Sequence, residues 1–344
     1  MTDVIALDAF ERRGGREPPR KPPTVFTAFD LMAEQFEPVN FIVPGYVAEG
    51  LTLLAGRPKL GKSWLCLEWA YAVAEGDTCL GGIRCIQGSV LYLALEDNRR
   101  RLQRRLRKII VSGFEAPERL HLATEWPRAN EGGIAEIKRW IDETHDARLV
   151  IVDVLAMFRP AQTPRDAAPY ERDYGAIKAL QALASETGVG IVVVHHTRKG
   201  AGEADPFEKV SGTLGLTGAA DAAVILDRDG NGASLYARGR DIEELESAVE
   251  FDRVSCRWRV IGEASEVRRS DERTQILDVL KDATEPLSPS DLSGALGWSS
   301  ANVRQLLFKM TKAGEVVKDG KHYVHPERMD LLRAPRPQEE DDEE

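Results

Sequence analysis

The stretch Gly56-Arg57-Pro58-Lys59-Leu60-Gly61-Lys62-Ser63 decides the fold of this chain. It fits the pattern G-x-x-x-x-G-K-[ST], in which glycines let the backbone curl around a phosphate so that N–H groups point at the anion. Residues 51–55 before it predict a buried strand, and residues 64–75 after it predict a helix. Because strand, loop and helix follow in the order that the motif needs, we predict a nucleotide site formed by this loop and the next residue, Trp64.

Two side chains of the loop have individual roles in such a site. Lys62 is expected to reach the β- and γ-phosphates, and the Ser63 hydroxyl is expected to help hold Mg²⁺. The sequence therefore predicts ATP and Mg²⁺ as ligands.

Composition is that of an ordinary globular chain of two or three domains. The 344 residues are 42% hydrophobic and 30% charged, with a net charge of -10. The last six residues, 339–344, are all acidic and supply six of those ten charges, so overall charge says little about nucleic-acid binding. The four cysteines form no C-x-x-C pair, which favours reduced thiols, no cysteine metal site and a cytoplasmic protein. Neither a signal peptide nor a membrane span is expected.

The order of patterns along the chain predicts an α/β fold followed by a small second domain. Strand patterns alternate with helix patterns and end in hairpins, which is typical of a mostly parallel central sheet with an antiparallel extension. The expected divisions are a flexible N-terminal arm (1–38), the α/β domain (39–262), a linker (263–270), a helix-turn-helix domain (271–328) and a disordered acidic tail (329–344).

Carboxylates follow two of the predicted strands. Strand ends in open α/β sheets face the ligand crevice, so polar residues there are candidates for chemistry. Glu96 is the candidate general base for an attacking water, with Asp97 as the second choice. Asp153 closes the run of residues 149–152 and is predicted to hold Mg²⁺ through water, whereas the plain alternative is a surface Asp at a strand end.

Histidines and arginines end two further strands. His195 and His196 follow the predicted strand of residues 189–194 and could sense the γ-phosphate; His196 is preferred. Arg238 and Arg240 flank Gly239. Each is either an arginine finger supplied to a neighbouring subunit or one half of a surface ion pair, with Asp241, Glu243 or Glu244 as partner.

Three basic segments invite a nucleic-acid interpretation. The arginine-rich helix expected at residues 98–111 is better explained by a solvated basic face, with DNA contact as a secondary possibility. The aperiodic loops 158–170 and 198–211 would line the channel of a ring and bring Arg198 and Lys199 to single-stranded DNA. The alternative is two ordinary mobile loops.

The last third of the chain predicts a winged helix-turn-helix. Helices are expected at residues 274–281, from Ser288, and at residues 300–313, followed by a hairpin around Asp319-Gly320 with a type I′ turn. Positive charge gathers on the third helix and the wing, which favours DNA contact over a protein–protein role. The residues predicted to contact nucleic acid are Arg304, Lys309, Lys312, Lys318 and Lys321.

An ordered set of motifs over residues 41–261 resembles the RecA-like ATPases of the RepA hexameric replicative helicase type, which occur on plasmids, phages and other mobile elements. The segments that carry the resemblance are GRPKLGKS (56–63), YLALED (92–97), LVIVDVLAMF (149–158), VVVHHTRKG (192–200), SGTLGLTGAADAAVIL (211–226) and ARGRDIEE (237–244).

This resemblance implies a RecA-type core, ATP, Mg²⁺, a hexameric ring and movement on single-stranded DNA. It implies that Lys62 and Ser63 bind nucleotide, Glu96 is the catalytic base and Asp153 the Walker B residue. It also implies that His196 is the sensor and that Arg238 or Arg240 is the finger.

Two features depart from the family, namely the bulky loop residues Pro58 and Lys59 and the added winged helix. Three functions therefore stay open: a helicase, an ATP-dependent DNA-binding protein of recombination or regulation, and a signalling ATPase without a nucleic-acid substrate.

Overall fold

The computed structural model describes residues 25–110, 115–161, 169–197, 205–208, 214–230 and 232–332. Arg198, Lys199, residues 1–24 and residues 333–344 lie outside the described residues, so the expectations for them are not addressed by the structure. The chain divides into two units after Pro38. In the first unit, helix α1 (Ala28–Ala33) begins at a capping box in which Thr27 accepts from the N–H of Asp30.

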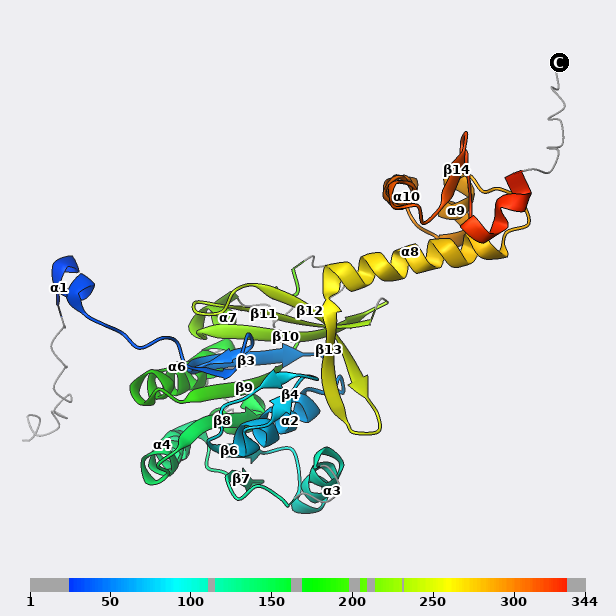
Figure 1. Ribbon diagram of the computed structural model, residues 1–344. Coiled ribbons are helices and arrows are strands. Elements are labelled where there is room, and N and C mark those ends of the chain that lie inside the picture. The colour runs from blue at the N-terminus through cyan, green and yellow to red at the C-terminus, as the bar shows by residue number, and fades with distance from the viewer. Residues whose placement is uncertain are drawn as a thin grey trace, which may run out of the picture. The chain divides into compact units, whose positions relative to one another are not determined.

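The second unit is built on a central sheet of nine described strands (Figure 1). Their order across the sheet is β13-β12-β11-β10-β3-β9-β8-β6-β7. The strands are β3 (Gly50–Gly56), β6 (Ser89–Ala94), β7 (Leu120–Ala123), β8 (Ala147–Asp153), β9 (Gly190–His196), β10 (Ala222–Asp229), β11 (Gly232–Gly239), β12 (Leu245–Asp252) and β13 (Arg257–Glu263).

Direction of the strands follows the expected mixed pattern. Strands β10, β3, β9, β8, β6 and β7 pair in parallel, and β11 to β13 extend the sheet in antiparallel fashion. Strand β6 and the last five residues of β8 and of β3 are fully buried, as expected for parallel strands covered on both faces. The mostly parallel sheet predicted from the sequence is confirmed.

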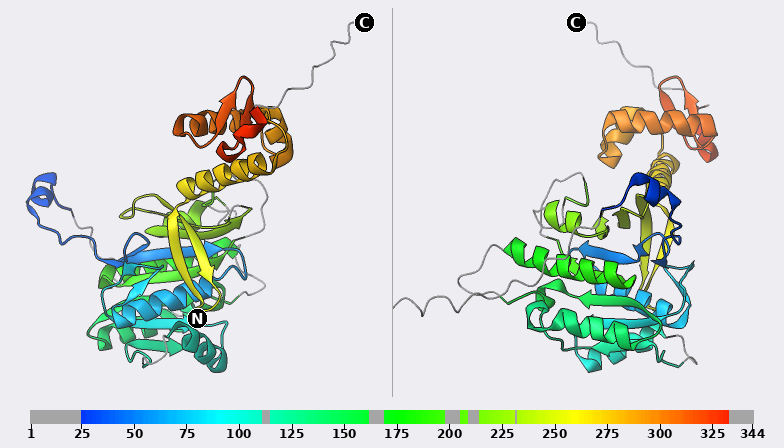
Figure 2. Two further views of the ribbon diagram at one scale, coloured as in Figure 1. Left: turned by 45° about the vertical axis from the view of Figure 1, so that its right-hand side comes forward. Right: turned by 90° about the vertical axis from the view of Figure 1, so that its left-hand side faces the viewer.

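Helices cover both faces of this sheet (Figure 2). One apolar cluster packs α2 (Lys62–Glu75) and α3 (Arg99–Ile109) against the sheet together with β1 (Phe41–Val43) and β2 (Val47–Ala48). The other packs the opposite face, and its helices are α4 (Gly133–Glu143), α5 (Leu155–Phe158), α6 (Pro169–Thr187) and α7 (Leu214–Ala219). The remaining elements before β6 are a short hairpin of β4 (Thr78–Cys79) and β5 (Ile83–Arg84).

The C-terminal part is a winged helix-turn-helix. Its elements are α8 (Ala264–Asp282), α9 (Pro289–Leu296), α10 (Ser300–Ala313), β14 (Val317–Asp319), β15 (His322–Val324) and a final 3₁₀ segment (Pro326–Leu332). Its apolar cluster includes Leu280, Leu292, Leu307 and Tyr323. Ser288 and Ser299 cap α9 and α10 with their side chains, which explains where each helix begins.

Two local predictions in this part are wrong. The first helix begins at Ala264 rather than Thr274, because the polar run at residues 264–273 holds no glycine or proline to stop a helix. The hairpin turns at Gly320-Lys321, because Asp319 pairs with His322. Only Gly320, with φ 58°, has a positive φ there, whereas a type I′ turn needs two such residues.

No helix in the described ranges is both long and apolar enough to cross a membrane.

Candidate functional site

The candidate site lies at one edge of the sheet, where four parallel strands end. Gly56, the last residue of β3, is level with His196 of β9 and with Leu226 of β10. Ala94 at the end of β6 is level with Asp153 at the end of β8. Parallel strands bring their carboxyl ends to the same edge, so the phosphate loop shares this edge with residues far away in sequence.

Two glycines shape the phosphate loop between β3 and α2. A Cβ atom on Gly56 would lie 2.3 Å from the carbonyl oxygen of Leu226, and one on Gly61 would lie 2.9 Å from the Trp258 ring. Gly61 also has φ 108°, a backbone conformation that favours glycine. As the N-cap of α2 it has no side chain to occupy the first N–H groups of the helix, which suits an anion at this end.

Lys62 is buried beneath this loop. Its ammonium donates to the carbonyl oxygens of Gly56 (2.7 Å) and Arg57 (2.9 Å) and to Nδ1 of His196 (3.1 Å). Burial lowers the pKa of Lys62 to about 8, against the opposing effect of nearby carboxylates, of which Asp153 is the strongest. The buried ammonium of Lys62 is held by carbonyl oxygens, which carry only partial negative charge. A phosphate carries full negative charge, so its oxygens would replace these carbonyl contacts with stronger ones.

His196 links Lys62 to Glu96. An ammonium can only donate, so Nδ1 of His196 accepts and the neutral ring carries its proton on Nε2. That nitrogen lies 4.0 Å from the nearer carboxylate oxygen of Glu96. Burial, followed by the charge of Lys62, lowers the pKa of His196, which keeps the ring neutral at pH 7. His195, the neighbouring residue on the strand, lines a small pocket together with His196 and Val154.

Asp153 is buried at the end of β8 and is oriented by Tyr92. The Tyr92 hydroxyl donates to Oδ2 of Asp153 at 2.7 Å and lies 3.4 Å from the carbonyl oxygen of Ser63. Tyr92 was not predicted from the sequence, although a hydroxyl inside an otherwise apolar strand indicates a buried partner. The Tyr92 hydroxyl thus lies between the carboxylate of Asp153 and the backbone of Ser63, the two residues predicted to hold Mg²⁺.

Asp97 is occupied by two arginines of α3. It accepts from Arg101 and, at 2.7 Å, from Arg105, and its side chain is only 7% exposed. Glu96 keeps a side chain that is 54% exposed. This contrast disfavours Asp97 as the general base and leaves Glu96 as the candidate.

The remaining residues of the phosphate loop, and Trp64 after it, differ in their contacts and exposure. The Arg57 guanidinium lies 3.9 Å from Asp227. Pro58 and Lys59 are exposed, and Lys59 has φ 63°. Trp64 packs its ring against Phe251, with the Arg105 guanidinium 5.3 Å from its centroid. Leu60 packs against the apolar cluster around α2. The loop is therefore held on both sides by side chains.

Arg238 and Arg240 lie away from the edge of the sheet that carries the phosphate loop. Strand β11 runs antiparallel to β10, so Arg238 pairs with Ala223 and is level with Leu53 in the middle of β3. Arg240 pairs with Asp221, which accepts from the N–H of Leu51 near the start of β3.

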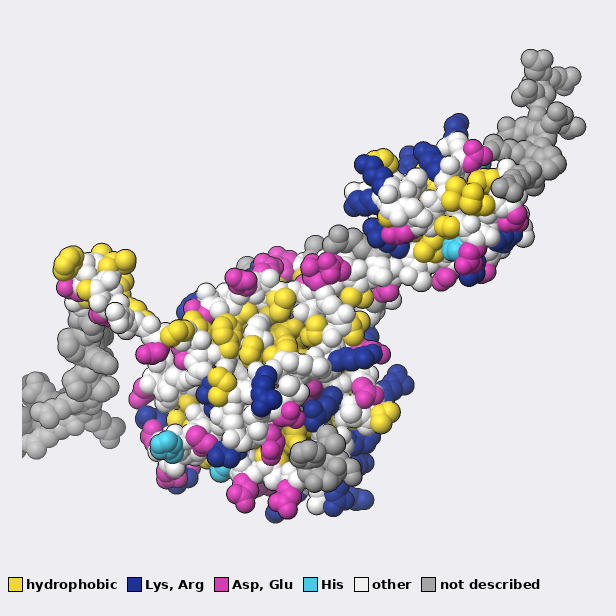
Figure 3. Space-filling model, viewed as in Figure 1, with side chains coloured by type: hydrophobic (Ala, Val, Ile, Leu, Met, Phe, Trp, Pro, Cys, Tyr) yellow, Lys and Arg dark blue, Asp and Glu magenta, His cyan; other side chains and the backbone are white. Residues whose placement is uncertain are grey.

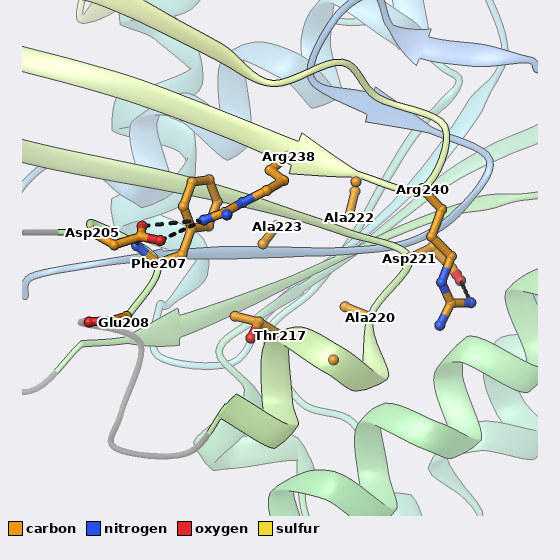
Figure 4. A pocket seen from close by; sticks show the side chains of 12 residues that line it. Asp205, Phe207, Glu208, Thr217, Ala220, Asp221, Ala222, Ala223, Arg238 and Arg240 are labelled. Atoms are coloured by element: carbon orange, nitrogen blue, oxygen red, sulfur yellow. Dashed lines mark hydrogen bonds and ion pairs between the residues drawn. The ribbon is translucent and has the colours of Figure 1, made fainter.

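These two arginines border a pocket of about 390 Å³ (Figure 4). Arg238 donates to Asp205 at 3.0 Å and lies 3.9 Å above the Phe207 ring, whereas Arg240 pairs with Asp221 at 3.2 Å. The expected partners Asp241, Glu243 and Glu244 make no described ion pair with either arginine.

The five basic residues of the winged helix-turn-helix that were predicted to contact nucleic acid are all exposed. Lys and Arg side chains gather over α10 and the wing (Figure 3), and Phe308 is 59% exposed among them with Lys312 4.6 Å from its ring. The predicted residues on this surface are Arg304, Lys309, Lys312, Lys318 and Lys321.

Metal-binding groups are sparse in the described ranges. No cluster of three or more His, Cys, Asp or Glu side chains there could hold a metal ion. A Mg²⁺ that is bound mainly by phosphates and water needs only a carboxylate and a hydroxyl from the protein, which Asp153 and Ser63 can supply. The four cysteines are buried free thiols.

Fold and site together define a RecA-like P-loop ATPase with a C-terminal winged helix-turn-helix. The AAA domain family matches residues 16–202, more than half of the chain, and the protein belongs to it. The IclR helix-turn-helix domain matches residues 274–320.

Solved structures with a similar fold include a DnaB-like replicative helicase, described with its interactions with primase. That likeness has a TM-score of 0.51 and 13% identity, and covers 70% of this chain and 67% of the helicase. A KaiC-like protein from the archaeon Pyrococcus horikoshii OT3 is also similar, with a TM-score of 0.44, 14% identity and coverage of 65% of this chain and 99% of that one. The first likeness supports the fold assignment.

Proposed function

We propose that this protein is an ATP-hydrolysing, DNA-dependent motor, a ring-forming replicative DNA helicase of the RepA type. The observation that carries the proposal is the separation of the two arginines from the other chemical groups. Lys62, Glu96, Asp153 and His196 gather where β3, β6, β8 and β9 end, whereas Arg238 is level with the middle of β3 and Arg240 lies near its start. Such a chain completes its site only with a second copy, as a ring would provide.

ATP would bind on the phosphate loop, with its phosphates at the N-terminus of α2. Lys62 exchanges its contacts with loop carbonyls for contacts with phosphate oxygens. Ser63 and Asp153 hold Mg²⁺, which when bound neutralises charge on those oxygens. Tyr92 fixes the carboxylate of Asp153 in place by its hydrogen bond.

Glu96 would orient the attacking water and take its proton. Its exposure leaves room for water, and Nε2 of His196 lies 4.0 Å from its carboxylate. When Lys62 turns to a phosphate it gives up its bond to Nδ1 of His196, so the histidine senses whether the γ-phosphate is present. One arginine of a neighbouring chain, Arg238 or Arg240, stabilises the charge of the transferring phosphoryl group.

A second candidate function rests on the winged helix-turn-helix. Its exposed cations on α10 and the wing suit a helix in a DNA groove with the wing on the backbone. The protein would then assemble on DNA in an ATP-dependent way and act in recombination or regulation without unwinding.

Three measurements test these proposals. The ATPase rate should rise when single-stranded DNA is added, and a rate indifferent to DNA would sink the motor. Displacement of one strand from a forked duplex separates the helicase from the DNA-assembly protein. The mass in solution with ATP and DNA should correspond to a hexamer. A Lys62→Ala variant, folded but unable to bind phosphate, serves as the control in each.

A further inference from the structure

Helix α3 carries an unusual concentration of positive charge. Seven of the ten residues from Arg99 to Lys108 are Arg or Lys, in a chain whose net charge is -10. The apolar residues Leu102 and Ile109 are buried, so the helix is anchored to the domain on one face only. The opposite face is open to solvent, and dark blue side chains gather in this part of the molecule (Figure 3).

Six of the seven cations of α3 fall into two sets, and the seventh, Arg99 at the start of the helix, is also exposed. Arg101 and Arg105 are paired with Asp97, and Arg105 also lies over Trp64. A second set is exposed and lies within 4.0 Å of no described carboxylate. Its members, which we call the α3 stripe, are Arg100, Arg104, Arg107 and Lys108.

Spacing puts the stripe on one broad face of the helix. Arg100, Arg104 and Arg107 are three or four residues apart, and Lys108 is four residues after Arg104, so the side chains project over about 12 Å of helix. Like charges at this spacing repel one another and destabilise the helix. No described acidic residue offsets this repulsion, which is the situation expected when the compensating charge comes from a bound polyanion.

We infer that the α3 stripe binds the phosphate backbone of DNA, at a surface separate from the winged helix. A row of guanidinium groups suits the closely spaced phosphates of a nucleic-acid strand, because a guanidinium donates to phosphate oxygens and carries a fixed charge. A nucleic acid is favoured over an acidic protein because the same chain carries a DNA-binding type of domain with its own exposed cations. The inference rests on the proposed dependence on DNA and adds a contact surface to it.

The test is the salt dependence of DNA binding by the full chain. Each phosphate contact contributes a slope in log K against log salt of roughly -0.7 for single strands and -0.9 for duplex DNA. We expect the triple variant Arg100→Gln, Arg104→Gln, Arg107→Gln to make the slope shallower by about 2 units on a dT oligonucleotide or about 3 on a random duplex. Whichever substrate responds is the form of DNA that the stripe contacts.

A matched control removes the same charge elsewhere. Arg84, Arg139 and Arg253 are exposed arginines scattered over the same domain, and their triple Gln variant should leave the slope nearly unchanged. Replacing the three stripe arginines by Lys should leave the slope of log K against log salt unchanged, because a lysine ammonium also neutralises a backbone phosphate. This Lys variant keeps the test valid if the Gln variant folds poorly.

Equal slopes for the stripe and control variants would overturn the inference. So would an unchanged DNA slope combined with lost binding of a poly-glutamate peptide, which would assign the helix to acidic protein segments. If the wild-type chain binds neither DNA at low salt, the proposed function fails as well. Normal DNA-stimulated hydrolysis with equal slopes would remove the α3 surface alone.

Discussion

The ammonium of Lys62 donates to Nδ1 of His196 at 3.1 Å, and the two residues are 134 positions apart in the sequence. This contact joins the phosphate loop to the end of β9 and, through the ring, to Glu96. A change in the contacts of Lys62 therefore changes the hydrogen bonding of His196.

Nucleotide binding should take up protons at high pH. Burial lowers the pKa of Lys62 to about 8, so the free protein loses that proton above pH 8. Phosphate charge favours the ammonium form and raises the pKa again. Calorimetry of ATP binding in buffers of different ionisation enthalpy should show uptake approaching one proton at pH 9 and little at pH 7. Equal uptake at the two pH values would contradict the assignment to Lys62.

Glu96→Gln should lower ATP hydrolysis by roughly a hundredfold or more while leaving ATP affinity close to normal. The change keeps the size of the side chain and removes its basicity. Asp97→Asn is the comparison, because Asp97 holds Arg101 and Arg105 instead. It should reduce thermal stability and leave hydrolysis within a few-fold. The opposite pattern would make Asp97 the base.

Mixing two inactive variants should restore ATPase activity if the arginine acts on a neighbouring chain. Arg238→Ala or Arg240→Ala removes a finger, with an expected loss of about a thousandfold. Lys62→Ala removes the phosphate site but retains both arginines. Mixed assemblies then contain some intact sites, whereas neither variant alone has any. The arginine whose variant is rescued is the finger, and no rescue of either would contradict a shared site.

Tyr92→Phe should raise the Mg²⁺ concentration needed for half-maximal hydrolysis by about tenfold, since Asp153 loses the hydrogen bond that orients it. Tyr46→Phe is a matched control: its hydroxyl is also buried and bonded, to Ser247 at 2.7 Å. Both variants should lose about 1 kcal/mol of stability. A Mg²⁺ titration that shifts equally in the two would show that Tyr92 has no specific role.

Stability of the ATPase domain should fall as the pH rises from about 5 to about 7. Burial raises the pKa of Glu68 to about 7, although its carboxylate accepts the backbone N–H groups of Leu80 and Trp258. The folded state therefore binds the proton more tightly than the unfolded state. The free energy of unfolding should fall by about 3 kcal/mol over this pH range. Urea unfolding followed by tryptophan fluorescence measures it. Glu68→Gln should flatten the dependence, and an unaltered one would exclude Glu68.

Much of the architecture could be predicted because its signals are local. The β-branched runs before Asp153 and His196, and the glycine-rich loop before Lys62, each encode one element and its end. The rule that parallel strands end at one edge then placed the candidate residues together. The helix from Ala264 and the turn at Gly320-Lys321 were mispredicted because polar and turn signals do not mark a boundary to the residue.

The sequence by itself determined the phosphate loop, the alternation of strands and helices, and the candidate residues at strand ends. Only the tertiary structure decided which partners those residues meet. The contacts of Tyr92 with Asp153 and of Lys62 with His196, and the separation of Arg238 from the phosphate loop, all depend on the order and direction of strands in the sheet. That order is set by the burial of whole faces between two layers of helices, which no local pattern contains.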